Sequence, residues 1–218
     1  DISLVAQKKA NEQLVHMAHV DSLTQLPNRS TFYDRLAFHM KKAFRNHHSV
    51  AVLLIDLDRF KDINDTLGHD YGDLLLKQTA KRLQGCIRDS DTVARLGGDE
   101  FTIIIDEADD FTVVERVAQK ILQQMRKPFD LKTNKVYVSV SIGIASYPSD
   151  ADNIDMLLRN ADQAMYAAKS KGRNNFIYFT SAMENQAQQR RLLLNDLRHA
   201  VSLQQLELVY QPIIDLNG

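Results

Sequence analysis

Acidic side chains stand at two places where apolar segments end. Asp56 directly follows the apolar run at residues 50–55, and Asp99 and Glu100 lie in a turn between two further apolar runs. If the first run and the turn belong to neighbouring strands, these carboxylates converge on one point. Hard oxygen ligands of this kind suit Mg²⁺, with phosphate oxygens completing its coordination. The pattern therefore predicts a metal-assisted site for a phosphorylated substrate.

Gly97 and Gly98 come directly before the acidic pair in this turn. Because glycine has no Cβ, a bulky anion can approach the backbone there. Carboxylates beside a phosphate repel it, so the arrangement requires a metal ion between them. Taken alone, a Gly-Gly-Asp sequence is a plain hairpin turn and a strand-end aspartate is a turn or cap residue. The functional interpretation depends on the two features meeting.

Hydrophobic periodicity indicates the elements that must position these residues. Strands are expected at 50–55, 92–95, 101–105, 136–145 and 175–179, and helices at 73–87, 111–126 and 153–170. Their order, βαββαβ followed by αβ, predicts an α+β fold. It is a ferredoxin-like palm with a central antiparallel or mixed sheet and flanking helices. The first strand of this palm lies beside the central hairpin, which brings Asp56 close to the turn at 97–100.

Further helices are expected outside the palm. One follows residues 21–29 and is capped by Ser30. Its inward-facing residues are expected to be Phe32, Leu36, Phe38 and Met40. Residues 183–205 form an extra C-terminal helix, followed by a strand-like segment with no obvious partner in the palm. Residues 2–19 are an amphipathic helix that could connect the palm to an upstream module.

Composition limits the class of protein. The chain has 218 residues, with 27 Lys and Arg against 28 Asp and Glu, so its net charge is −1. We therefore expect no nucleic-acid polymer as a partner and no membrane contact. The single cysteine, Cys86, indicates a reducing, cytoplasmic compartment. Because the chain begins at Asp1 rather than Met and ends directly after an apolar run, we expect it to be a fragment of a longer protein.

The segment RLGGDEF at residues 95–101 resembles the signature of the GGDEF family of diguanylate cyclases. Four other segments resemble the family's blocks in the same order, namely DSLTQLPNR (21–29), LLIDLDRFKDINDTLGHDYGD (53–73), VSVSIGIA (138–145) and ADQAMYAAKSKGRN (161–174). The resemblance covers roughly residues 20–180. It implies a domain that condenses two molecules of GTP into cyclic di-GMP and two pyrophosphates.

The resemblance also implies a metal and catalytic site. Asp56, the carbonyl of Leu57, Asp99 and Glu100 would hold Mg²⁺ or Mn²⁺. Asp99 and Glu100 would be the catalytic residues, and Glu100 would be either a second acidic ligand or a proton acceptor.

A substrate site follows from the same resemblance. The matching residues are Asn64 and Asp73 for guanine, Lys61, Lys169 and Arg173 for the triphosphate, and Phe60, Gly97 and Gly98 for other contacts with the nucleotide. By residue type alone, an Asn-Asp turn and a helix N-cap are the favoured interpretations of Asn64 and Asp73. Lys169 and Arg173 are four residues apart and are expected on one face near a helix C-terminus, where basic side chains also complement the helix dipole.

Arg88 and Asp91 resemble the family's product-inhibition motif, at the expected distance before the signature. This site would bind cyclic di-GMP as a feedback inhibitor, with the guanidinium making a bidentate contact to the product. A surface ion pair is the alternative for the same two residues.

The tail at residues 197–218 resembles the opening of an EAL domain, a cyclic di-GMP phosphodiesterase. We therefore divide the chain into a helical linker (1–19), a cyclase domain (20–180), and a linker helix with the start of a truncated EAL domain (181–218). Since each cyclase domain holds one GTP, activity implies a homodimer. The alternative function is a GTP-binding regulatory module that controls a downstream EAL phosphodiesterase and has little cyclase turnover.

Overall fold

The computed structural model describes residues 19–202, 205 and 209. The helix expected at 2–19 and the strand-like segment expected after residue 205 lie almost entirely outside these residues. The chain divides into two compact units, Asp1–Ser181 and Ala182–Gly218. Helix α7 (Ser181–Ser202) accounts for nearly all of the described part of the second unit. No helix within the described ranges is long and apolar enough to cross a membrane.

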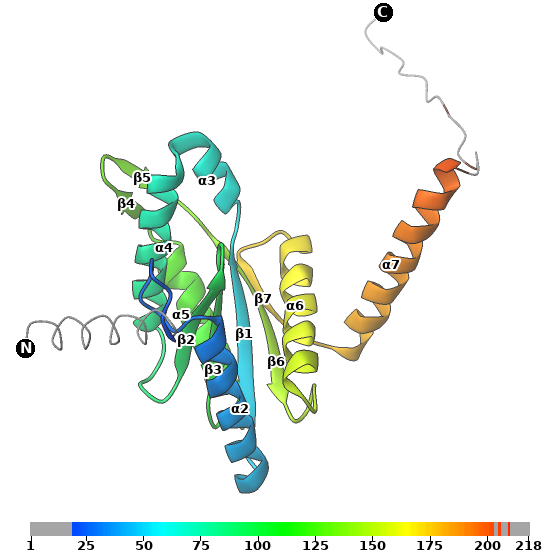
Figure 1. The fold of residues 1–218 in the computed structure, drawn as a ribbon, viewed down its shortest axis with the longest axis horizontal. Coiled ribbons are helices and arrows are strands. Elements are labelled where there is room, and N and C mark those ends of the chain that lie inside the picture. Colours follow the sequence, from blue (N-terminus) through cyan, green and yellow to red (C-terminus); the bar gives the residue numbers. More distant parts are fainter. Residues whose placement is uncertain (1–18, 203–204, 206–208, 210–218) are drawn as a thin grey trace, which may run out of the picture. The chain divides into compact units, whose positions relative to one another are not determined.

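A five-stranded sheet forms the centre of the first unit (Figure 1). Its strands are β1 (Val50–Leu57), β2 (Thr92–Gly97), β3 (Glu100–Ile105), β6 (Val140–Tyr147) and β7 (Asn175–Tyr178). Their order in the sheet is β2-β3-β1-β6-β7. Strand β1 is antiparallel to both of its neighbours, β3 and β6, whereas β7 is parallel to β6. The α+β fold with a mixed central sheet is confirmed.

Helices cover both faces of the sheet (Figure 1). Helices α4 (His69–Gln84) and α5 (Phe111–Met125) pack on one face, and α2 (Arg29–Asn46) and α6 (Ile154–Ser170) pack on the other. Successive side chains of a strand point to opposite faces. In β1, Leu53 belongs to the core beneath α4 and α5, and Leu54 belongs to the core beneath α2 and α6. Burial on both faces explains why the run at 50–55 is apolar without interruption.

The segment after β1 contains two helices where the sequence periodicity predicted one. Helix α3 (Phe60–Leu67) comes first, and Gly68, with a φ of +92°, separates it from α4. Helix α4 therefore begins at His69 rather than at residue 73. Phe60, Ile63 and Leu67 pack against the core at helical spacing. With only 8 residues, α3 has too few turns for this spacing to stand out.

Strand β6 begins later than the strand predicted at 136–145. Val136 instead ends a separate hairpin of β4 (Phe129–Leu131) and β5 (Asn134–Val136), in which it pairs with Phe129. Val136, Val138 and Val140 are all buried. The alternating pattern therefore continues through the point where the backbone changes its pairing partner.

Helix α2 departs from its prediction at two positions. Its N-cap is Asn28, whose side chain accepts a hydrogen bond from the Thr31 amide, and Ser30 lies inside the helix. Phe38 is 61% exposed, whereas Phe32, Leu36 and Met40 are buried as expected. Two residues after Leu36, Phe38 is turned about 200° around the helix axis, so it faces away from the core.

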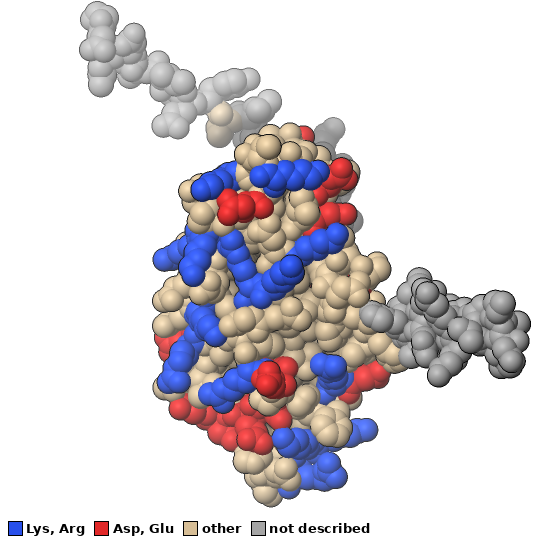
Figure 2. All heavy atoms as spheres, turned by 90° about the vertical axis from the view of Figure 1, so that its left-hand side faces the viewer, with Lys and Arg blue, Asp and Glu red and all other residues tan. Residues whose placement is uncertain are grey.

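Positive side chains gather on one face although the chain is nearly neutral. Figure 2 shows the left-hand side of the view in Figure 1, where many Lys and Arg side chains lie on the upper and left-hand parts of the face. Helix α4 and the β4–β5 hairpin lie on this side (Figure 1). They carry the exposed residues Lys77, Lys81, Lys132 and Lys135. Asp and Glu side chains also lie on this face, in smaller groups (Figure 2).

Arg95 ties the start of the domain to the turn that follows β2. Its guanidinium donates to both carboxylate oxygens of Asp21, at 3.0 and 3.2 Å, and to the carbonyl of Gly98, with a shortest distance of 2.7 Å. Its backbone amide donates to the carbonyl of Pro27 at 3.0 Å. One side chain therefore fixes the segment before α2 against the signature turn.

We expect Asp21→Asn to lower the free energy of unfolding by roughly 2 kcal/mol at neutral pH, because a largely buried, charge-assisted contact is lost. Burial raises the pKa of Asp21, but hydrogen bonds from Thr24 and Arg95 outweigh it and hold the pKa of this carboxyl below its usual range. The ionised carboxylate therefore stabilises the fold above the unfolded-state pKa, and this stabilisation is lost as the pH falls through the folded-state pKa.

Urea unfolding of wild type and variant at neutral pH and below about pH 4 measures this effect, and the difference should shrink at the lower pH. Asp34→Asn, which changes an exposed carboxylate on α2, is the matched control. An Asp21 variant as stable as wild type at neutral pH would contradict the role given to this contact.

Candidate active site

The pairing of β1 with β3 places Asp56 directly opposite Glu100. The sheet therefore joins the end of β1 to the signature turn, as the element order predicted. Gly97 and Gly98 have φ values of +143° and +53°, which favour glycine. A Cβ built on either glycine would meet no atom within 4 Å, so the turn borders open space beside the carboxylates.

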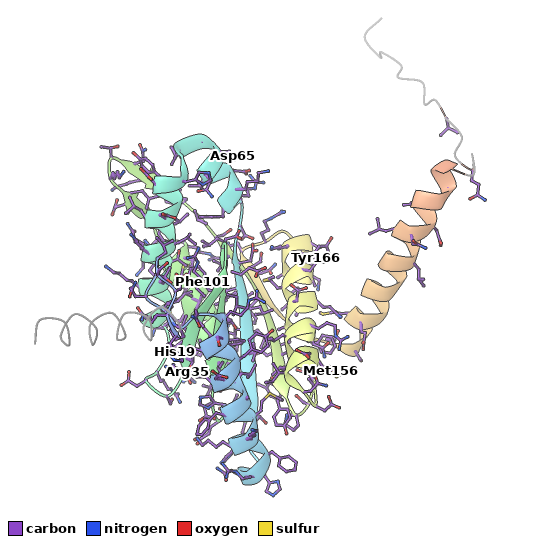
Figure 3. All side chains as sticks on the ribbon, in the orientation of Figure 1. His19, Arg35, Asp65, Phe101, Met156 and Tyr166 are labelled. Atoms are coloured by element: carbon purple, nitrogen blue, oxygen red, sulfur yellow. The ribbon has the colours of Figure 1, made fainter. Side chains whose placement is uncertain are left out.

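Figure 3 shows how the surrounding elements frame this end of β1. The labelled Asp65 lies on α3, Phe101 on β3 and Tyr166 on α6. These residues neighbour Asn64, Glu100 and, one helical turn further along, Lys169. Glu100 on β3 and Lys169 on α6 lie beside Asp56, and α3 begins shortly after the end of β1.

Asp56 is only 8% exposed and pairs with Lys169, whose Nζ lies 2.7 Å from Oδ2. Burial raises the pKa of Asp56, the charges of Asp99 and Asp58 raise it further, and Lys169 opposes them. Asp99 and Asp58 thus each add negative charge near Asp56, and Lys169 is the cation that offsets it there. This local excess of negative charge favours an additional cation.

The residues present fit a metal ion that arrives with its substrate. Within the described part of the chain, no group of three His, Cys, Asp or Glu side chains is arranged to hold a metal unaided. Magnesium is commonly held by one or two carboxylates together with substrate phosphates. Asp56, at the end of β1, and Asp99, in the turn directly before Glu100, can supply such a partial shell. Leu57, the last residue of β1, follows Asp56 directly.

The predicted guanine-binding residues lie on α3 and α4. The Oδ1 atom of Asn64 is buried without a hydrogen-bond partner, so it has unused hydrogen-bonding capacity. A Cβ on Gly72 would lie 2.0 Å from this atom and 3.2 Å from the ring of Phe60. Asp73 is exposed and lies inside α4, which excludes the N-cap role considered for it. Gly72 thus leaves the room that Asn64 occupies.

Lys169 and Arg173, the two predicted triphosphate-binding residues near the end of α6, differ in backbone conformation. Lys169 lies in the last turn of the helix, which ends at Ser170. Arg173 follows the helix with a φ of +63°, so the prediction that it shares a helix face with Lys169 is wrong. Lys61 is exposed on α3. These cations therefore come from a short helix, a helix end and a loop.

Arg88 and Asp91 lie in the connection between α4 and β2. The backbone amide of Arg88 donates to Asp91 Oδ2 at 3.1 Å, and the amide of Asp91 donates back to the carbonyl of Arg88 at 3.1 Å. The side chain of Arg88 is exposed. Burial raises the pKa of Asp91. The contact that links this pair is a tight turn made through the backbone.

Sequence reasoning missed Asp58, a buried carboxylate two residues after Asp56. Residues two apart in a strand lie on the same face, which was the available signal. It accepts hydrogen bonds from Ser139 and Ser141, two residues that are themselves two apart. The pairing of β1 with β6 sets Ser141 opposite Asp56, and only this register brings the two serines to Asp58.

Residues 18–175 match the family described as diguanylate cyclase, GGDEF domain. The chain belongs to this family. It is 45% identical over 211 residues to MucR of Pseudomonas aeruginosa, named a bifunctional diguanylate cyclase/cyclic di-GMP phosphodiesterase. That match covers 96% of this chain and 31% of MucR, so the chain spans about a third of that relative's length.

Two solved structures support the same family. The GGDEF domain of TpbB (YfiN) from Pseudomonas aeruginosa has a TM-score of 0.76 and 43% identity, covering 78% of this chain and 99% of that one. The coiled coil and GGDEF domain of DgcB from Caulobacter crescentus, solved with c-di-GMP, has a TM-score of 0.71 and 26% identity. It covers 81% of this chain and 94% of that one.

Gly72→Ala should displace Asn64 and weaken GTP binding by at least about tenfold, because the methyl group takes the space of the amide. Alanine is better than glycine in a helix by up to about 1 kcal/mol, but forced repacking costs about 1–3 kcal/mol, so the melting temperature should also fall. Calorimetry and thermal melting measure the two effects.

Gly85→Ala is the matched control, since its Cβ would meet backbone oxygens only at 3.6 and 3.7 Å. It should keep GTP affinity within about twofold of wild type, because these are ordinary van der Waals distances. Equal GTP affinities in the two variants would remove Asn64 from the nucleotide site.

Proposed function

We propose that residues 20–180 condense two molecules of GTP into cyclic di-GMP and two pyrophosphates. The observation that carries this proposal is the register of β1 and β3, which sets Asp56 opposite Glu100. Glu100 is exposed, and the adjoining glycine turn leaves space for phosphate groups. Membership of the diguanylate cyclase family supports the same reaction.

In this proposal, the residues around the end of β1 bind the metal ion and the triphosphate. Mg²⁺ or Mn²⁺ held by Asp56, the Leu57 carbonyl, Asp99 and Glu100 would neutralise phosphate charge and favour ionisation of the attacking 3′-hydroxyl. Lys169 is already at 2.7 Å from Asp56, where it can also bind a phosphate oxygen beside that carboxylate. Lys61 and Arg173 add positive charge for the triphosphate.

Other residues bind the guanine base and accept the proton of the 3′-hydroxyl in this proposal. Asn64 and Asp73 hydrogen-bond to the edge of guanine, and Phe60 contacts the nucleotide from α3. Glu100 accepts the proton that leaves the 3′-hydroxyl, or else binds the metal as a second acidic ligand. The exposure of Glu100 permits either role.

A homodimer completes the reaction in this proposal. One domain holds one GTP, and the 3′-hydroxyl of that nucleotide attacks the α-phosphate of a GTP held by a second copy. The attack is in line, and pyrophosphate leaves from the opposite side of phosphorus. A single copy therefore has no second nucleotide to attack and should be inactive.

A GTP-binding regulatory module with little turnover is the second candidate function. It is favoured by the resemblance of residues 197–218 to the opening of an EAL domain, which would make 181–218 a linker and a truncated second domain. The relative MucR is named for both activities. In this role the domain would bind GTP and control a downstream phosphodiesterase.

Asp99→Asn should lower cyclase turnover by at least about 10²-fold, because one anionic ligand and its charge stabilisation of the transition state are lost. The assay incubates the chain with GTP and Mg²⁺ and separates the products by chromatography. Asp34→Asn, on the exposed side of α2, should retain the wild-type rate. A rate for Asp99→Asn within about threefold of wild type would contradict the assignment of this residue.

Cyclic di-GMP should inhibit the wild type through Arg88 and Asp91. We expect Arg88→Ala to lose about 2–4 kcal/mol of product affinity, as for a charge-assisted contact at a partly desolvated site. The free energy of unfolding should change by at most about 1 kcal/mol, because the side chain is exposed.

The measurement for Arg88→Ala is the cyclase rate against added cyclic di-GMP, with thermal melting as the control. An inhibition curve identical to wild type would leave Arg88 as a surface residue. A collapsed melting temperature would show instead that the arginine is structural.

A further inference from the structure

Asp58 is a buried carboxylate whose oxygens are all committed within the fold. It is 7% exposed and directly follows β1. Oδ2 accepts from Ser139 Oγ at 2.6 Å and from the backbone amide of Asn174 at 3.2 Å, and Oδ1 accepts from Ser141 Oγ at 2.7 Å. The Asp58 amide donates to the carbonyl of Ser139 at 2.9 Å.

Neutral donors alone satisfy this carboxylate. Across residues 19–202, no Lys, Arg or His side chain lies within ion-pair distance of Asp58. Burying a charge costs stability unless hydrogen bonds replace its hydration, and an apolar side chain would fill the same space without that cost. Core packing therefore gives no reason for an aspartate here, whereas the need for several acceptors in fixed directions does.

The three hydrogen bonds join segments that carry the candidate active site. One is the end of β1, which presents Asp56 and Leu57. The second is the start of β6, where Ser141 pairs in register with Asp56. The third is the connection between α6 and β7, reached through the amide of Asn174.

The α6–β7 connection needs such an anchor because its backbone is unusual. Gly172, Arg173 and Asn174 have successive φ values of +102°, +63° and +51°. Left-handed conformations at residues other than glycine persist only when surrounding contacts hold them. The Arg173 amide donates to the carbonyl of Ala168 at 3.1 Å, and the next amide, that of Asn174, donates to Asp58. Together these two hydrogen bonds fix the backbone position of Arg173.

We propose that Asp58 is a positioning residue for the triphosphate of the nucleotide. By accepting from the Asn174 amide, it holds Arg173 at the end of β1 that presents Asp56. The role depends on hydrogen-bond acceptance in fixed directions and not on the negative charge of Asp58. This inference rests on the proposed function, in which Arg173 binds the triphosphate.

Binding of a non-hydrolysable α,β-methylene analogue of GTP with Mg²⁺, measured by calorimetry on the full chain, tests the proposal. Asp58→Ala removes the acceptor and should weaken binding by at least about tenfold. Asp58→Asn keeps an acceptor oxygen for Asn174, and its amide can donate to a serine hydroxyl, so it should bind within about threefold of wild type. Asp58→Leu, which fills the volume without an acceptor, should behave as Asp58→Ala does and replaces it if that variant does not fold.

A double-mutant cycle separates positioning from a general structural role. In an Arg173→Ala background, Asp58→Ala should weaken binding by less than about threefold, because the side chain that it positions is already absent. Additive losses would overturn the proposal, and so would equal weakening by Asp58→Asn and Asp58→Ala, which would show that charge matters. Wild-type affinity in Asp58→Ala and Asp58→Leu would overturn the inference alone. A wild-type chain that does not bind the analogue would overturn the proposed function and this inference with it.

Discussion

The antiparallel register between β1 and β3 is the constraint on which the rest of the site depends. It sets Asp56 opposite Glu100. A slip of one residue would turn every side chain of β1 to the other face of the sheet. Because the middle residues of β1 are apolar and buried on both faces, their burial alone does not select the register. Asp56, at the end of β1, and Asp58, directly after it, have specific side-chain partners, Lys169 on α6 and Ser141 on β6, which a slip would separate.

Charge at the end of β1 is distributed so that attraction for a cation remains. Asp58 is satisfied by neutral donors, and Lys169 meets Asp56 at one oxygen. Asp99 adds a further negative charge near Asp56, and Glu100 lies exposed across the strand pair. A nucleotide triphosphate is itself strongly negative, so these carboxylates and the phosphates are compatible only with a metal and with basic side chains between them. The strand register, the local charges and the family membership therefore all favour a metal-assisted nucleotide site at the end of β1.

Much of this arrangement could be predicted from the sequence, and the failures have physical causes. The convergence of Asp56 with the glycine turn follows from element order, because in a split βαβ palm the first strand lies beside the central hairpin. Arg173 was misplaced because helical spacing was extended past Gly172, although glycine after a helix is a signal for its end. Helix α3 was too short for its period to be visible, and the β4–β5 hairpin interrupts no hydrophobic pattern. Asp58 acquires its partners only through tertiary register, which no single segment encodes.

The central claim is that two copies of the chain join two GTP molecules at this strand end. The most direct test follows product formation by chromatography in GTP and Mg²⁺ over a series of protein concentrations. The account predicts cyclic di-GMP with two pyrophosphates for each product molecule, and a rate per chain that rises with protein concentration until the dimer is saturated. GTP that stays intact while bound, at concentrations where the chain is dimeric, would contradict it.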